Sequence, residues 1–180
     1  AMGGDRREQR GERAVREHRA ALSAFLHTAR GVPAAQWERP LGEGKWSAAE
    51  VTEHLALSYD AVLRERSGGG SMAPRASSRR QAFLRWFLLP HMLFHRTMPR
   101  VSAPREVRPA PTGLGREEAL ERLRSVGEQA EEAYRDAPHA RLTHPYFGSL
   151  DRSQAFRLIA LHIEHHQGQL RESAAQTRTG

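Results

Sequence analysis

The stretch at residues 152–175 reads RSQAFRLIALHIEHHQGQLRESAA and shows a helical pattern that recurs along the chain. Its apolar side chains recur at steps of three, four and seven residues, as they do along one face of an α-helix. Asp151 is a suitable N-cap just before the stretch, and Gln154 stands three residues on, where it can complete a capping box. We therefore predict a helix over residues 152–175 with an inward stripe of Phe156, Ile159, Ile163 and Leu170.

Three further stretches show the same periodicity, and we expect helices at about residues 6–29, 47–66 and 116–136. Ser47 can cap the start of the second helix while Glu50 reaches back to the Ser47 N–H. Gly31 and Pro33 end the first helix, and the flexible run 67–71 ends the second. The expected inward stripes are Val15, His18, Leu22, Phe25 and Leu26; Val51, Leu55, Ser58 and Val62; and Leu120, Leu123, Gly127, Ala130 and Tyr134.

Four long amphipathic helices without a convincing strand indicate an all-α fold, a four-helix bundle in a single domain over residues 1–180. The link between the second and third helices, residues 67–115, is a long, irregular Arg/Pro-rich connection that permits a crossover. Pro90 falls in the middle of its apolar run, where it would kink or restart a helix. Residues 1–5 are expected to be disordered or vector-derived, outside the fold.

The composition excludes several kinds of chemistry. The chain has no cysteine, so disulfides, thiolate metal ligands and a thiol nucleophile of its own are ruled out. It has no apolar run of the roughly 20 residues that a membrane span needs and no apolar signal core at the N-terminus, so we expect a cytoplasmic protein. The formal net charge of +7 is concentrated in residues 75–108, which contain eight arginines and a single acidic residue, Glu106.

Histidines on the apolar stripes are the candidate metal ligands. His162 and His166 stand four apart and therefore share one helical face, a spacing at which two imidazoles can chelate one ion. His166 and His54 both border inward stripes, where neutral imidazoles need partners that a shared ion would supply. His165 points about 100° away from His166 and is not expected to join them. Gln169, on the His162 side of the helix, has two interpretations, a ligand-orienting group or a surface residue.

Four other histidines are weaker candidates for metal ligands. His18 lies on the stripe of the first helix and is better explained as a hydrogen-bonded core histidine. His144 lies in a loop before the last helix and is not favoured, and His91 and His95 stand four apart in the Pro-interrupted segment, where we do not expect a regular helix. No nucleophile motif, phosphate-binding loop or nucleic-acid-binding motif is present, so no catalytic residue is assigned.

Together, residues 46–55 (WSAAEVTEHL), 144–148 (HPYFG) and 162–170 (HIEHHQGQL) resemble the DinB superfamily. The resemblance implies a four-helix bundle, often a homodimer, with a three-histidine metal site. Carried over by position, the ligands are His54, His162 and His166. The implied metal is one divalent ion, which is zinc, nickel or iron in this family. Some members use a low-molecular-weight thiol such as mycothiol or bacillithiol as cosubstrate for S-transfer or isomerisation.

The function expected from these observations is a divalent-metal-dependent enzyme, a thiol S-transferase or hydrolase acting on a small electrophile. With no cysteine in the chain, the nucleophile must be water or the thiol of a cosubstrate. The alternative is a non-catalytic metal-binding or stress-response module. The basic apolar insert would then serve dimerisation, a membrane surface or nucleic acid, of which the last two are not favoured. Neither the metal nor the substrate is specified by three histidines.

Overall fold

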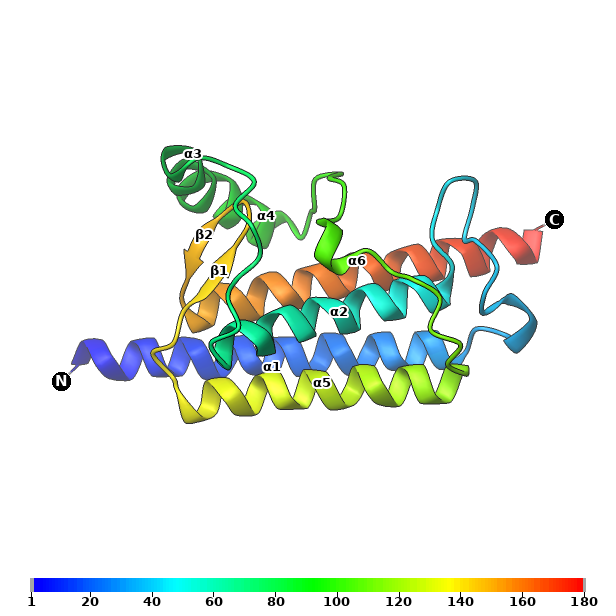
Figure 1. The fold of residues 1–180 in the computed structure, drawn as a ribbon, viewed down its shortest axis with the longest axis horizontal. Helices are drawn as coiled ribbons and strands as arrows, with labels where there is room; N and C mark the ends of the chain where they lie inside the picture. Colours follow the sequence, from blue (N-terminus) through cyan, green and yellow to red (C-terminus); the bar gives the residue numbers. More distant parts are fainter. Residues whose placement is uncertain (1, 180) are drawn as a thin grey trace.

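The computed structural model describes the backbone of residues 2–179 and the side chains of residues 5–174 (Figure 1). Four long helices form the bundle: α1 (Met2–Arg30), α2 (Ala48–Arg66), α5 (Arg116–Asp136) and α6 (Arg152–Thr179). The predicted all-α four-helix bundle is therefore confirmed. Residues 2–5, which we expected to be disordered or vector-derived, are helical and form the first turn of α1; their origin stays a prediction.

The four helices do not alternate in direction. Figure 1 shows α1 and α6 running one way, while α2 and α5 run the other way. α1 packs along α6, and α2 packs along α5. Because α2 and α5 are parallel, the connection between them must return the chain along the whole bundle, which explains its length. The connection between α2 and α5 is therefore a crossover, as its length permitted.

The inward stripes form the core largely as expected. Both capping boxes are present: Ser47 N donates to Glu50 at 2.7 Å, and Asp151 N donates to Gln154 at 3.0 Å. Ser58 and Ile159, two members of the predicted stripes, are only half-buried. Tyr59 takes the inward place next to Ser58 and is 2% exposed.

The insert is more regular than we expected. Three consecutive segments, α3 (Ser78–Phe83), the π-helical turn η2 (Leu84–Leu88) and α4 (Leu89–His95), form one helical rod, and η3 (Arg105–Val107) follows as a 3₁₀ turn. Leu89 N donates to the oxygen of Leu84, five residues back, and Pro90 follows at once. Pro90 has no N–H to donate, so the rod takes a wide turn here and α4 restarts. A further 3₁₀ turn, η1 (Ala34–Gln36), lies between α1 and α2.

A small hairpin corrects the expectation that the chain has no strand. β1 (Leu142–His144) pairs antiparallel with β2 (Gly148–Leu150), and the HPYFG loop forms its turn. Each strand is three residues long, too short to show a period of two in the sequence. Gly148 has a positive φ of 66°, and a Cβ there would meet the side-chain oxygen of Gln81 at 2.6 Å. The hairpin therefore packs closely against α3.

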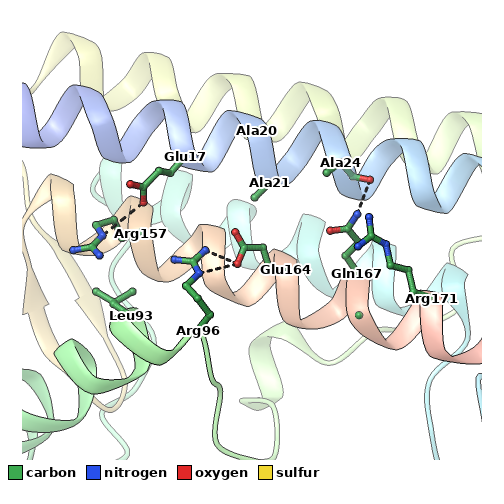
Figure 2. A pocket seen from close by; sticks show the side chains of 11 residues that line it. Glu17, Ala20, Ala21, Ala24, Leu93, Arg96, Arg157, Glu164, Gln167 and Arg171 are labelled. Carbon is green, nitrogen blue, oxygen red and sulfur yellow. Dashed lines mark hydrogen bonds and ion pairs between the residues drawn. The ribbon is translucent and has the colours of Figure 1, made fainter.

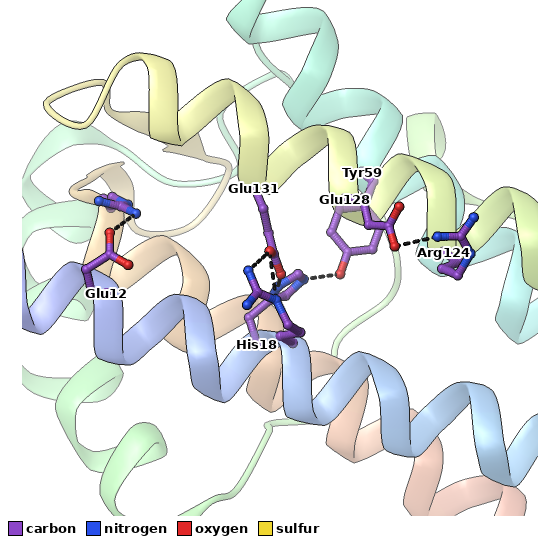
Figure 3. Close-up of polar contacts among 8 residues, drawn as sticks. Glu12, His18, Tyr59, Arg124, Glu128 and Glu131 are labelled. Carbon is purple, nitrogen blue, oxygen red and sulfur yellow. Dashed lines mark hydrogen bonds and ion pairs between the residues drawn. The ribbon is translucent and has the colours of Figure 1, made fainter.

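A buried polar network ties three helices of the bundle together (Figure 3). His18 of α1, fully buried, donates from Nδ1 to Glu131 of α5 at 2.8 Å and accepts the hydroxyl proton of Tyr59 of α2 at Nε2. Arg19 also donates to Glu131, at 2.6 Å. Burial would raise the pKa of Glu131, but the hydrogen bonds from His18 and Arg19 outweigh it and hold that pKa below its ordinary value. The interpretation of His18 as a hydrogen-bonded core residue fits this arrangement.

None of the helices in the described part of the chain combines the length and the apolar content that crossing a bilayer requires.

Two buried tyrosines allow a matched test of this network. Tyr59→Phe leaves Nε2 of His18 buried without a donor, so we expect the free energy of unfolding to fall by about 1–3 kcal/mol. Tyr134 is 1% exposed, and its hydroxyl has no partner among the described residues, so Tyr134→Phe should cost nothing. Urea unfolding of both variants measures the difference, and equal losses would contradict the role given to Tyr59.

Candidate metal centre

Three imidazoles from two helices meet inside the bundle. His54 comes from α2, and His162 and His166 come from consecutive turns of α6. Nε2 of His162 lies 3.0 Å from Nε2 of His54 and 3.1 Å from Nε2 of His166. One ligand atom from each of the three rings lies within 4.8 Å of the others. The structure thus brings together all three histidines that the sequence pointed to.

Two of the rings are fixed in one tautomer by oxygen acceptors. Nδ1 of His54 lies 2.7 Å from the backbone oxygen of Val107, and Nδ1 of His166 lies 2.8 Å from the side-chain oxygen of Gln169. These oxygens only accept, so each Nδ1 carries the proton and each Nε2 carries a lone pair. Hydrogen bonds of this kind orient imidazole ligands in known metal sites.

The arrangement of lone pairs fits a shared cation. The Nε2 atoms of His54 and His166 both face Nε2 of His162, and a single N–H on that ring could satisfy only one of them. Nitrogens bound at about 2.0–2.1 Å to a tetrahedral ion lie about 3.3 Å apart, and at right angles about 2.9 Å apart. The two observed separations fall between these values. A divalent ion would satisfy three buried nitrogens that otherwise lack enough donors.

Burial keeps the three rings neutral at physiological pH. It lowers the pKa of His54 below its ordinary value and the pKa of His166 to about 3. The pKa of His162 is well below its ordinary value, first because of burial and then because of repulsion from the neighbouring imidazoles. Neutral rings present lone pairs, so protons compete little with a metal ion at neutral pH.

Trp46 covers one side of the three-histidine group. Its ring centroid lies 4.8 Å from that of His54 and 6.3 Å from that of His166, nearly parallel to the latter. Trp46 directly precedes the N-cap Ser47, so the capping box that starts α2 also places this indole. The side chain is half-buried and forms a partly apolar wall beside the imidazoles.

Four other histidines are not members of this group, although the ring of His165 lies beside that of His166, with centroids 5.3 Å apart. His165 is half-buried and contacts the side-chain nitrogen of Gln169 at 3.3 Å. His144 accepts at Nδ1 from two backbone N–H groups of the hairpin turn, and burial lowers its pKa to about 4. His91 and His95 are exposed neighbours on α4, where the helix is regular despite the expectation that it would not be. None of these four belongs to the group of His54, His162 and His166.

Sequence reasoning missed one contact of the three-histidine group and left the role of another open. Val107 lies in the insert and acts through its backbone oxygen, for which no residue type is a signal. Gln169 had two interpretations, and the structure places its oxygen on His166. Its position seven residues from His162 was the available signal, because such a residue lies on the same helical face.

A separate groove of about 750 Å³ lies between α1, α6 and the end of α4 (Figure 2). Arg96 pairs with Glu164 there, and Gln167 donates to the backbone oxygen of Ala24 at 3.1 Å. None of the three clustered histidines lines this groove. Many of its polar groups are engaged with one another, so we do not assign it a ligand.

The fold and the site together define a helical bundle with a three-histidine centre that can hold a metal ion. The family model of the DinB superfamily matches residues 17–170, most of the chain. The protein therefore belongs to the DinB superfamily, as its motifs suggested.

Among solved structures, the chain is similar to YfiT from Bacillus subtilis, which is described as a probable metal-dependent hydrolase with an unusual four-helix bundle topology. The superposition has a TM-score of 0.55 at 15% sequence identity and covers 93% of this chain and 87% of that one. At this identity the likeness supports the fold. A search of the curated proteins found no match.

The ligand assignment predicts a specific loss of metal. His54→Ala, His162→Ala and His166→Ala should each abolish stoichiometric binding of Zn²⁺, Ni²⁺ or Fe²⁺, because two imidazoles with no carboxylate beside them hold an ion weakly. His165→Ala, on the same turn of α6, should bind like the wild type. Elemental analysis of untagged protein after loading and desalting measures this, and metal retained by all four variants would exclude the site.

The orienting role of Gln169 predicts a smaller effect. Gln169→Leu removes the acceptor for Nδ1 of His166 and should weaken metal affinity by about 10- to 100-fold. Gln169→Glu keeps an acceptor and should retain most of the affinity. Competition with a chromogenic chelator measures both, and equal affinities for the Leu variant and the wild type would show that Gln169 does not orient the ring.

Proposed function

We propose that this protein is a divalent-metal-dependent enzyme that adds water or a small thiol to a small electrophile. The observation that carries the proposal is the donor set. Three neutral imidazoles converge, and no carboxylate stands in the group they form among the described residues. Three protein ligands are typical of catalytic zinc sites, which keep a position open, whereas structural zinc sites usually have four.

The chain's own residues hold and shield this centre. His54, His162 and His166 would bind the ion through Nε2, while Val107 and Gln169 keep the protons on the outer nitrogens. A bound divalent ion would supply Lewis acidity, lowering the pKa of a water or thiol at its open position. Trp46 excludes water from one side of the rings.

The nucleophile is either water or a thiol that the chain itself does not supply. The chain has no cysteine, so a sulfur nucleophile must come with a cosubstrate. The description of YfiT as a probable metal-dependent hydrolase supports water as the nucleophile. The resemblance to thiol-using members of the DinB superfamily supports a thiol such as mycothiol or bacillithiol. Both reactions need the same open position on the same ion.

A comparison of loaded proteins tests the proposal. Metal-loaded wild type should release p-nitrophenol from p-nitrophenyl acetate, or conjugate monochlorobimane when mycothiol or bacillithiol is present. The His162→Ala variant should fall to the rate of metal-free protein, while His165→Ala should keep the wild-type rate. Turnover without thiol identifies a hydrolase, and turnover only with thiol identifies an S-transferase. Equal rates in the wild type and His162→Ala would contradict an enzymatic role for this centre.

A further inference from the structure

The rod of α3, η2 and α4 exposes aromatic side chains to solvent. We call Phe83, Trp86, Phe87 and Phe94 the aromatic face; they are 61%, 71%, 66% and 82% exposed. Within the described residues, the exposed large apolar side chains are these four and Val101, so all lie in the insert. Such clustering marks an interaction surface, because soluble proteins rarely gather large aromatics in one exposed patch.

The aromatic face is a continuous side of the rod, distinct from the side that packs in the core. Its members follow one another at steps of three, one and seven residues, which places them along one side of the rod. Phe83 and Phe87 contact each other, with ring centroids 5.0 Å apart. The other side of α4 presents Leu89, Met92 and Leu93, all buried in the core. Figure 1 shows the rod standing out from the bundle beside the hairpin.

The charged side chains of the segment that carries the aromatic face are all positive. Residues 67–105 contain no acidic residue. Arg79 and Arg80 precede Phe83 by four and three residues, so they lie on the same side one turn away, and Arg100 follows the rod. All three are exposed, and no ion pair joins them to a carboxylate in the described part of the chain. Arg85 and Arg96 are engaged instead with the hairpin and with Glu164.

We propose that the aromatic face and its flanking arginines dock the protein on the surface of an anionic lipid bilayer. Tryptophan and phenylalanine on one side of a helix insert at the boundary between headgroups and acyl chains, and basic side chains at that level attract anionic lipids. The rod supplies both features on one exposed side. The proposal is independent of the metal centre, whose histidines it does not use.

Charge and shape favour a bilayer over two other possible partners of this face, a second copy of the chain and a single-stranded nucleic acid. In a symmetric dimer through this face, the same patch would meet itself, and arginines would face arginines without an acidic partner from residues 67–105. Proteins that stack single-stranded bases on aromatic rings do so along a basic groove. Here the four aromatic side chains are exposed, and the helical rod that carries them projects from the bundle, which suits a flat layer.

Vesicle binding by the full chain tests this inference. The protein should sediment with vesicles of phosphatidylcholine and phosphatidylglycerol at low salt, less so at high salt, and not with phosphatidylcholine alone. Trp86 is the exposed tryptophan, whereas Trp37 is buried and Trp46 half-buried. Its fluorescence should therefore shift to shorter wavelength on binding, and Trp86→Phe should remove this shift while retaining sedimentation.

Matched variants locate the contact. Trp86→Ser/Phe87→Ser and Arg79→Glu/Arg80→Glu should each abolish sedimentation, while their circular dichroism and metal content stay at wild-type values because these side chains are exposed. Arg39→Glu/Arg135→Glu makes the same charge change at exposed positions outside the insert and should still sediment. Equal losses in both charge variants would overturn the assignment to this face.

Other outcomes would also overturn the proposal. No association with anionic vesicles at low salt would refute it. If the wild type is a dimer that Trp86→Ser/Phe87→Ser converts to a monomer, and vesicles do not bind, the face pairs with a second copy. Binding to single-stranded DNA without binding to vesicles would assign it to nucleic acid.

Discussion

The nitrogens buried between α2 and α6 impose the constraint on which the candidate metal centre depends. A hydrocarbon interface there would need only close packing, whereas imidazoles must each find partners for two nitrogens. Oxygens of Val107 and Gln169 accept hydrogen bonds from the Nδ1–H groups of His54 and His166, which leaves their Nε2 lone pairs directed at the common centre. The position of α6 along α1 and the capping boxes that start α2 and α6 then set where those lone pairs meet.

Much of this could be predicted because it follows from local periodicity. A four-residue step places His162 and His166 on one face whatever the rest of the chain does, and the stripe beside His54 indicates which way that ring points. Ser47 with Glu50 and Asp151 with Gln154 predicted where their helices begin, and both boxes are present. The four-helix bundle and the convergence of the histidines followed from such signals together.

The features that were missed depend on contacts between distant parts of the chain. The strands of the hairpin are stabilised by pairing across a turn and by contact with α3, and neither leaves a pattern in three residues. The rod around Pro90 is helical because its aliphatic side packs on the core, which overrides the break that proline suggests. The identity of the metal stays a prediction, since imidazole donors suit several metal ions. The reaction and the expected homodimer stay predictions as well.

The hydrogen bond from His54 to Val107 bears on how relatives of this chain should be compared. A peptide oxygen is present whichever amino acid occupies the position, so residue 107 could differ among relatives while the contact is kept. Alignments that score side chains would pass over it. What the contact does require is a connecting segment of suitable length and path, so insertions and deletions between α4 and α5 carry more information about the centre than point differences in that segment.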